Sequence, residues 1–264
     1  MLDIKGISKT FNPGTINEKH ALTKLDLRLE NNDFVTVIGG NGAGKSTLLN
    51  AIAGVWPLDE GHIVLDGEDI TRLPEHKRAK NIGRVFQDPM MGTAPDMQLE
   101  ENLALAMRRG NRRGLRWEIT NDEREEYYEK LKELGLGLED RMKVKVGMLS
   151  GGQRQAITLL MATLKKPKLL LLDEHTAALD PTTAAKVLEL SDKLVSENKL
   201  TTLMITHNMK DAIRHGNRLI MMNEGNIILD ISGEEKMKLT NQDLLDKFAE
   251  VASRQEETDE VLLS

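Results

Sequence analysis

The chain has 264 residues, of which 36 are lysine or arginine and 42 are aspartate or glutamate, so its formal charge is −6. This length allows one large domain or two small ones, since domains usually span about 100–200 residues. With 39% hydrophobic and 30% charged residues, the composition supports a packed core and excludes overall disorder. The acidic balance disfavours a nucleic-acid-coating protein, so we expect no nucleic-acid partner.

Other classes of protein are excluded by what the sequence lacks. It has no cysteine, which removes disulfides, thiolate metal sites and cysteine nucleophiles. Its apolar runs, such as 169–172, are far shorter than the about 20 residues of a membrane-spanning helix. No basic segment followed by an apolar stretch opens the chain, so we expect no secretory signal. These features predict a soluble, intracellular protein with at most a hard-cation site.

The first third of the chain predicts strands. Apolar and charged residues alternate over 25–30, the period of a strand with one solvent-exposed face. Residues 34–38 are apolar except for Thr36, as in a strand buried on both faces. A glycine-rich loop follows, and the pattern then predicts a short helix over 47–53. Residues 63–65 predict a strand that enters a tight Asp-Gly turn at 66–67.

The middle of the chain changes to the helical period. From about 99 to 163 this period predicts a helical subdomain inserted into a sheet-containing core. The segment also carries the densest basic stretch, with Arg108, Arg109, Arg112, Arg113 and Arg116. Such a run is usually a solvated surface, although it could also meet lipid phosphates or acidic loops of a membrane protein.

Strands return after residue 167. The pattern predicts a buried strand over 169–172, an amphipathic helix over 182–198 and another strand over 201–205. A closing hairpin is predicted over 219–222 and 227–231, and a last helix over 242–252. Strands that alternate with helices around a parallel sheet define an α/β fold.

Residues 39–46 fit the phosphate-binding pattern G-x-x-x-x-G-K-[ST], between a buried strand and a helix. Glycines let backbone N–H groups surround a phosphate, and the helix adds its positive N-terminal end. Lys45 would reach the β- and γ-phosphates of ATP, and Ser46 would offer its hydroxyl to Mg²⁺. The residues expected to contact the nucleotide here are Gly39, Asn41, Gly42, Ala43, Gly44, Lys45, Ser46 and Thr47.

A second motif supplies carboxylates. The buried strand over 169–172 ends in Asp173 and Glu174, whose side chains point to opposite faces because strands alternate. Asp173 is therefore placed to hold Mg²⁺ through its water shell, and Glu174 to polarise an attacking water.

The pentapeptide Leu-Ser-Gly-Gly-Gln at 149–153 makes the interpretation specific. Taken alone it is a helix N-cap at Ser150. Because it lies between the phosphate loop and the Asp173 strand, the chain resembles the ATP-binding-cassette (ABC) ATPases over about 1–235. The resemblance implies an α/β fold, with a P-loop NTPase core, an antiparallel β subdomain and an inserted helical subdomain.

The resemblance also implies boundaries. The core would comprise 1–87 and 167–235, and the inserted helical subdomain 88–166. A charged helix and tail would follow over 236–264.

Further roles follow from the resemblance alone. Gln87 resembles the glutamine that senses γ-phosphate and Mg²⁺ and contacts membrane subunits. Asp180 resembles a residue of the loop between paired cassettes, and His207 resembles the switch histidine that joins γ-phosphate to Glu174. Phe11 resembles the aromatic residue that stacks on adenine. ATP bound to one copy would also contact the partner copy, through Ser150, Gly151, Gly152 and Gln153.

One position departs from the family pattern. Relatives commonly have proline directly after the metal strand and its glutamate, whereas this chain has His175. Histidine lacks the fixed φ of proline, so the loop after Glu174 is less constrained. A second nucleotide sensor at His175 is an alternative interpretation.

The resemblance implies a subunit that hydrolyses ATP with Mg²⁺ and pairs head to tail with a second copy. It would drive a small solute, with amino acids as the candidate class, through separate membrane permease subunits at the cytoplasmic face of the membrane. A solute-binding protein would complete such an importer. A cassette ATPase acting on DNA or the ribosome is the alternative, but the long coiled-coil insertion or second cassette typical of those proteins is missing here. A P-loop kinase is disfavoured by the motif at 149–153.

Overall fold

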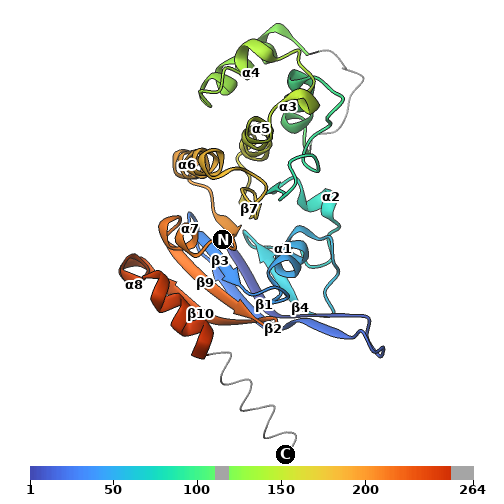
Figure 1. Cartoon of the computed structure of the whole chain (residues 1–264). Coiled ribbons are helices and arrows are strands. Elements are labelled where there is room, and N and C mark those ends of the chain that lie inside the picture. The colour runs from blue at the N-terminus through green and yellow to red at the C-terminus, as the bar shows by residue number, and fades with distance from the viewer. Residues whose placement is uncertain (111–118, 251–264) are drawn as a thin grey trace, which may run out of the picture.

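The computed structural model describes residues 1–110 and 119–250 (Figure 1). Its strands are β1 (Leu2–Phe11), β2 (Lys19–Leu29), β3 (Phe34–Gly39), β4 (Glu60–Leu65), β5 (Glu68–Asp69), β6 (Ile82–Val85), β7 (Leu169–Asp173), β8 (Thr202–Ile205), β9 (Arg218–Asn223) and β10 (Asn226–Ser232). Its α-helices are α1 (Lys45–Ala53), α2 (Glu75–Arg78), α3 (Leu99–Met107), α4 (Asn121–Lys132), α5 (Gly151–Thr163), α6 (Pro181–Asn198), α7 (Met209–Arg214), α8 (Gly233–Lys238) and a last helix over 241–250. Within these described residues, no helix has both the length and the apolar character needed to cross a membrane.

The N-terminal strands form an antiparallel sheet in the order β2-β1-β4-β5. The central strand is β1, and its Leu2 lies opposite Leu29 of β2 on one side and Leu65 of β4 on the other. Asp66 and Gly67 connect β4 to β5 with φ values of +55° and +80°. Both angles lie in the left-handed region that tight hairpin turns use, as the Asp-Gly pair predicts.

The second sheet has the order β10-β9-β3-β8-β7-β6 and is parallel except for β10, which pairs antiparallel with β9. Its register aligns the two strands that carry the nucleotide motifs. Val37 of β3 and Asp173 of β7 both lie opposite Ile205 of β8. The carboxyl ends of these strands therefore meet at one edge, where α/β proteins bind ligands.

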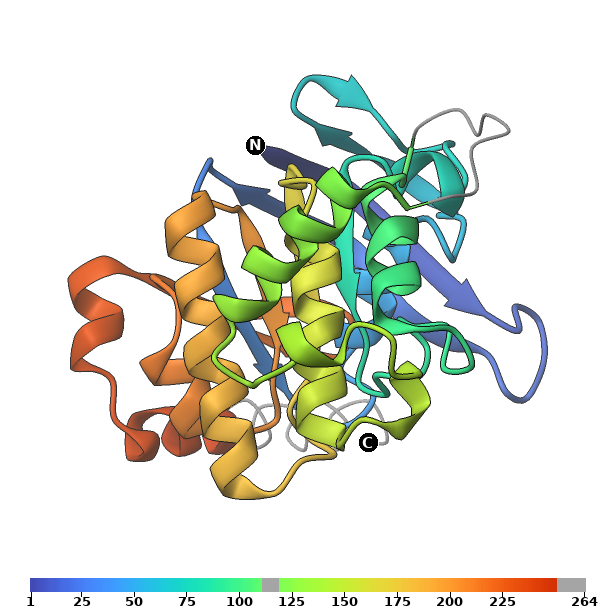
Figure 2. The same ribbon diagram turned by 90° about the horizontal axis from the view of Figure 1, so that it is seen from above.

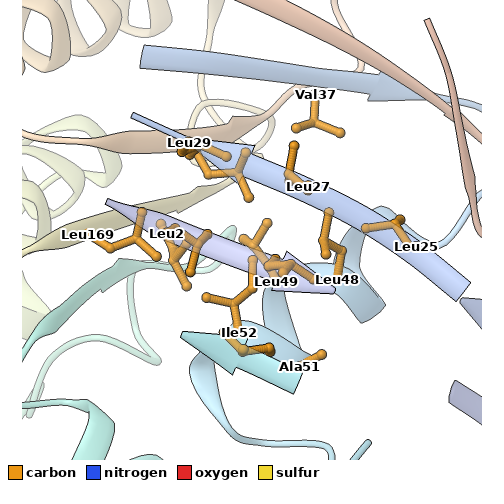
Figure 3. Close-up of a cluster of buried hydrophobic side chains, with 14 of the residues drawn as sticks. Leu2, Leu25, Leu27, Leu29, Val37, Leu48, Leu49, Ala51, Ile52 and Leu169 are labelled. Atoms are coloured by element: carbon orange, nitrogen blue, oxygen red, sulfur yellow. The ribbon is translucent and has the colours of Figure 1, made fainter. Parts of the chain in front are cut away.

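The largest apolar cluster fills the space between the two sheets, around α1 (Figure 3). Leu48, Leu49 and Ile52 of α1 are fully buried there and belong to the same cluster as Leu2 and Leu27 of the antiparallel sheet. The helix α1, which follows the phosphate loop, is thus packed between both sheets. This packing fixes the position of the loop that precedes it.

The chain leaves the parallel sheet after β6 and returns at β7. In between, α3, α4 and α5 lie together at one end of the molecule (Figures 1 and 2). They share an apolar cluster of their own, which includes Tyr127, Leu131 and Ile157. A further cluster includes Leu159 of α5, Leu188 of α6 and residues of β6, β7 and β8, and it connects the helical segment to the sheet.

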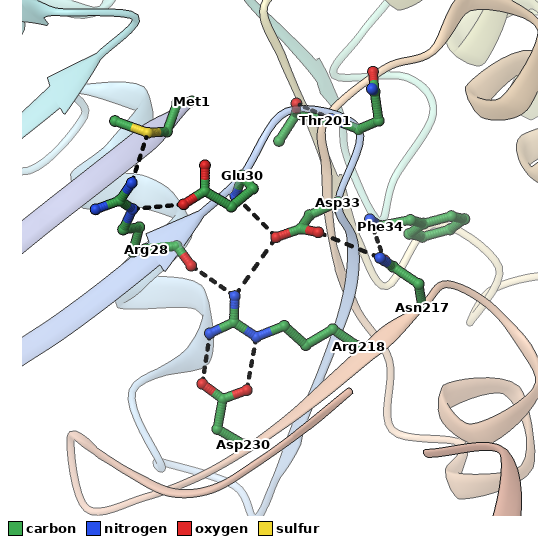
Figure 4. A network of polar contacts seen from close by, with 10 residues as sticks. Met1, Arg28, Glu30, Asp33, Phe34, Thr201, Asn217, Arg218 and Asp230 are labelled. Atoms are coloured by element: carbon green, nitrogen blue, oxygen red, sulfur yellow. Dashed lines mark hydrogen bonds and ion pairs between the residues drawn. The ribbon is translucent and has the colours of Figure 1, made fainter. Parts of the chain in front are cut away.

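A polar network ties the two sheets together at the other end of β3 (Figure 4). The guanidinium of Arg218, on β9, donates to Asp230 of β10 at 2.7 Å and to the carbonyl of Arg28, on β2, at 2.6 Å. Asp33 lies 3.6 Å from the same guanidinium and also accepts from Asn217 at 3.3 Å. Arg218 is 18% exposed, so these charged contacts are shielded more than ordinary surface ion pairs.

Candidate nucleotide-binding site

The phosphate loop joins the buried end of β3 to the first turn of α1. Gly44, immediately before Lys45, has φ +99°, and a Cβ there would collide with the carbonyl oxygen of Ala21. Glycine is therefore required at this point of the loop. The turn between β9 and β10 supports the loop, because the Gly225 N–H donates to the carbonyl of Ala43 at 3.0 Å. The first N–H groups of α1 have no intrahelical partners and remain available for an anion.

Lys45 is 8% exposed and its ammonium group donates to the carbonyls of Gly39 and Gly40 at 2.7 and 2.9 Å. Burial lowers the pKa of Lys45, while the charges of Glu174 and Asp173 act in the opposite direction. The ammonium group thus donates to loop carbonyls, while the negative charges of two carboxylates favour its protonated form. A bound phosphate would take over those hydrogen bonds.

The other predicted loop residues offer contacts of different kinds. Asn41, Gly42 and Ser46 are exposed, Thr47 is half-buried, and Ala43 is buried. Ser46 lies in the first turn of α1, so its hydroxyl is free to meet a cation held on a phosphate.

Asp173 and Glu174 end β7 in different environments. Asp173 is mostly buried and pairs with Arg84 at 3.4 Å. Burial raises the pKa of Asp173, and the adjacent Arg84 opposes that rise. Glu174 leaves the strand with φ +44°, and its N–H donates to the carbonyl of Ile205 at 3.1 Å. Glu174 therefore lies in a turn outside β7, so strand alternation, on which the prediction rested, does not set the direction of its side chain.

His207 lies beside Glu174, with its Nδ1 3.7 Å from the Glu174 carboxylate. The ring is 63% exposed, so it can reach a ligand as well. Gln87 is exposed and follows β6, whose Val85 pairs with Leu172 next to Asp173. These register contacts bring Gln87, Asp173 and His207 to the same edge of the sheet as the phosphate loop.

The Ser46 hydroxyl and the Asp173 carboxylate fit Mg²⁺. This ion usually binds through one or two protein oxygens, while phosphate and water oxygens complete its shell. Among the described residues, no three His, Asp or Glu side chains gather as a self-sufficient metal cage. Ser46, Asp173 and Gln87 therefore suit a cation that arrives with a nucleotide.

The pentapeptide at 149–153 caps α5, as predicted. The Ser150 side chain accepts from the Gln153 N–H at 3.3 Å, and the Ser150 N–H donates to the Gln153 side chain at 3.2 Å. Gly152 has no room for a side chain because Thr183 of α6 lies against it. In Figure 1, α5 lies with α3 and α4, whereas α1 lies with the antiparallel sheet. The structure therefore does not bring Ser150, Gly151, Gly152 and Gln153 to the phosphate loop of the same chain.

Asp180 and Phe11 also have local structural contacts. The Asp180 carboxylate caps α6 by accepting from the Thr183 N–H at 3.1 Å, and hydrogen bonds from the Thr183 side chain and N–H lower the pKa of Asp180. Phe11 ends β1 and packs edge-to-face with Trp56, with ring centroids 5.5 Å apart.

His175 is a structural residue, so the nucleotide-sensor interpretation is wrong. Its ring is 2% exposed and lies 3.0 Å from the Ser191 hydroxyl on α6. Burial, with a smaller contribution from His215, lowers the pKa of His175 to about 4. A buried neutral imidazole that faces α6 cannot contact a bound nucleotide.

The arginine cluster divides into two parts. Arg108 pairs with Glu123 at 3.2 Å, and Arg109 donates to the carbonyl of Ala162 at 3.2 Å. Both side chains therefore have partners within the chain. Arg112, Arg113 and Arg116 lie outside the described residues.

Two residues near the site were missed by the sequence reasoning. Arg84 donates to Asn50 of α1 at 2.8 Å and to Asp173 at 3.4 Å, so it joins the phosphate-loop helix to the metal strand. Gln155 of α5 is fully buried and donates to the carbonyl of Phe86, next to Gln87, at 3.3 Å. A charged residue within a short apolar strand was the available signal for Arg84, whereas the position of Gln155 gave none.

Comparison with known proteins identifies the family. The ABC transporter family model matches residues 22–177. A tyrosine transport ATP-binding protein of Clostridioides difficile is 46% identical over 253 residues, which cover 94% of this chain and 98% of that protein. A spermidine/putrescine import ATP-binding protein of Haemophilus influenzae is 34% identical over 236 residues, 89% of this chain and 59% of that protein.

Solved structures agree with this relationship. An ABC transporter cassette in its ADP conformation superimposes with a TM-score of 0.77 and 28% identity, over 94% of this chain and 98% of that one. A dimeric bacterial ABC transporter cassette gives 0.74 and 30%, over 88% and 98%. With its phosphate loop, paired carboxylates and capped pentapeptide in one fold, the chain belongs to the ABC transporter family and is an ATP-binding, ATP-hydrolysing cassette.

Proposed function

We propose that this cassette energises the uptake of a small solute, an amino acid such as tyrosine, through separate membrane permease subunits. The observation that carries the solute class is the 46% identity, across 94% of the chain, to a tyrosine transport ATP-binding protein. The cassette would work at the cytoplasmic face of the membrane, where ATP is available. A solute-binding protein would deliver the solute to the permease.

We further propose that two copies bind ATP between them, head to tail. The capped start of α5 presents N–H groups that suit a phosphate, yet it lies apart from the phosphate loop of its own chain (Figure 1). A second copy could bring Ser150, Gly151, Gly152 and Gln153 against an ATP held by Lys45. A related cassette has been solved as a dimer, which supports this arrangement.

In the closed dimer, catalysis would rest on positioning and charge. Lys45 would leave the loop carbonyls and bind the β- and γ-phosphates. Mg²⁺, held through Ser46, Asp173 and Gln87, would neutralise phosphate charge. Glu174 would accept a proton from the attacking water, and His207, 3.7 Å away, would hold the carboxylate toward the γ-phosphate.

The permease-facing surface would lie beside Gln87. Met90 and Met91 follow that residue and are 37% and 70% exposed, and Met148, before Ser150, is 74% exposed. One side chain connects the two segments: Arg154 donates to the sulfur of Met90 at 2.9 Å and to the carbonyl of Gly147 at 3.0 Å. These exposed methionines lie beside Gln87 and beside the pentapeptide at 149–153, and they suit contact with an apolar helix of a partner protein.

The test measures the uptake of labelled tyrosine and of labelled spermidine by a strain that lacks this cassette. Wild-type cassette should restore tyrosine uptake, and Glu174→Gln should not, although the purified Glu174→Gln protein should still dimerise with ATP in light scattering. Restoration of spermidine uptake instead would refute the solute class. Normal ATP turnover by Glu174→Gln would refute the role of Glu174 as the base, and co-purification with ribosomes or DNA in place of a permease would favour the non-transport alternative.

A further inference from the structure

The end of β1 extends beyond its neighbouring strand. The pairing of β1 with β4 ends at Ser8 and Glu60, whereas β1 continues to Phe11 along β2. The residues after Ser8 therefore have no β4 backbone to accept their hydrogen bonds. An edge of this kind needs other partners to hold a fixed conformation.

The Asp59 side chain supplies these partners. Its carboxylate accepts from the Thr10 N–H at 2.6 Å and from the Lys9 ammonium at 2.8 Å. The Asp59 N–H in turn donates to the Ser8 carbonyl at 3.0 Å. Two of these bonds hold the backbone at Ser8 and Thr10, and the third holds the Lys9 side chain, so the segment immediately before Phe11 is fixed.

Trp56 fixes the ring of Phe11 itself. The two rings meet edge-to-face at 84°, with centroids 5.5 Å apart, while the Lys9 ammonium lies 5.7 Å from the Phe11 centroid. Trp56 is 41% exposed, more than a purely core aromatic residue would be. Its backbone follows directly from α1, since the N–H groups of Val55 and Trp56 donate to the carbonyl of Asn50 at 2.9 and 3.5 Å.

We propose that Trp56 and Asp59 are positioning residues that set the Phe11 ring for the adenine base and couple it to the phosphate-loop helix. This inference rests on the proposed ATP-driven function and on the expectation, from the family resemblance, that Phe11 stacks on adenine. The segment 54–59 carries the connection, because it leaves the C-terminal end of α1 and reaches the end of β1. The helix whose first turn holds the phosphates therefore also sets the distance to the base.

The test compares the calorimetric affinity of the full chain for Mg-ATP with that for Mg-tripolyphosphate, which lacks the base. Phe11→Ala should weaken ATP binding about tenfold and leave tripolyphosphate binding unchanged. Trp56→Leu should weaken ATP binding about two- to tenfold, and Asp59→Asn by about threefold, again without an effect on tripolyphosphate. Glu60→Gln, an exposed neighbour outside these contacts, is the matched control and should change neither affinity.

Each result supports or refutes a specific part of the proposal. If Phe11→Ala leaves ATP binding intact, the adenine contact itself is refuted. If Phe11→Ala acts on ATP alone but Trp56→Leu and Asp59→Asn have no effect, the positioning role falls while the proposed function stands. Equal losses of ATP and tripolyphosphate would show that Trp56 acts on α1 alone and would overturn the proposal. In a Phe11→Ala background, Trp56→Leu should have no further effect, and an undiminished effect would identify Trp56 as a direct base contact instead.

Discussion

The buried His175 should make the cassette sensitive to acid. The Ser191 hydroxyl lies 3.0 Å from His175 Nε2 and itself donates to the carbonyl of Val187 at 2.8 Å. The hydroxyl therefore accepts from the Nε2–H, and a second proton would have to enter at a buried Nδ1. This accounts for a folded-state pKa of about 4, against an ordinary value of 6.5.

The sign and size of the effect follow from proton linkage. Between pH 6.5 and 4 the unfolded chain takes up a proton on this histidine and the folded chain does not, so the free energy of unfolding falls as the pH falls. Well above pH 6.5 the histidine is neutral in both the folded and the unfolded chain, so it causes no loss of stability there. At pH 5 the loss is about 2 kcal/mol, and it approaches about 3 kcal/mol at lower pH.

Urea unfolding at pH 7.5 and pH 5, followed by far-UV circular dichroism, measures this loss. His175→Gln keeps an amide for Ser191 but does not titrate, so between the two pH values it should lose about 2 kcal/mol less than the wild type. Ser191→Ala keeps the buried imidazole and should retain the acid sensitivity of the wild type. Equal losses for the wild type and His175→Gln would refute the reasoning, because all other carboxylates and histidines are common to both proteins.

Three further predictions concern residues around the phosphate loop. Arg78 is 3% exposed and donates to the carbonyls of Ala51, Ile52, Thr71 and Leu73 at 2.7–2.8 Å. Arg78→Met should therefore cost about 3 kcal/mol in urea unfolding, with Arg78→Lys recovering part of that; a cost below about 1 kcal/mol would contradict it. Gly44→Ala should abolish ATP binding in calorimetry, because φ is +99° and Ala21 blocks the Cβ, whereas Gly135→Ala, at φ +64° with open space, should bind normally. Because Arg84 holds down the raised pKa of Asp173, Arg84→Met should move the acid limb of the ATPase pH profile to higher pH, and Arg84→Lys should largely restore it; an unmoved limb would separate Arg84 from Asp173.

The sequence was most informative where the residue pattern itself sets the geometry. The largely apolar run at 34–38 predicted a buried strand, and β3 covers Phe34–Gly39 in the centre of its sheet. The helix expected over 47–53 begins two residues earlier, at Lys45, because Gly44 already provides the left-handed residue before the first turn. The hairpin predicted over 219–222 and 227–231 corresponds to β9 and β10, each slightly longer than expected.

Other elements were missed because their signals are not local. The strand β1, for example, mixes polar and apolar residues and is defined by its pairing with β2, the next strand in the chain, and with β4, which is distant in sequence. The helices α7 and α8 have six residues each, too few for a helical period to be detected. Tertiary contacts decide such elements, and a single sequence does not contain them in readable form.

The same distinction separates the motif residues from the residues that tune them. Lys45, Asp173 and Glu174 are found by spacing, because the chemistry of phosphate and Mg²⁺ demands those groups at a strand end. Their electrostatic state is set from elsewhere in the chain. Asp173 has Arg84, 89 positions earlier in the sequence, as its neutralising partner, and burial would otherwise raise its pKa further.

The physical reason is that a motif specifies which groups meet the ligand, whereas burial and charge depend on every element packed around them. Arg84 illustrates this, since its guanidinium also lies 4.5 Å from the Phe86 ring centroid and donates to Asn50 of α1. Replacing it would change the metal carboxylate, the phosphate-loop helix and the strand before Gln87 together. A cassette with an unaltered set of motifs can therefore still differ from its relatives in nucleotide affinity and pH dependence, through side chains that no motif contains.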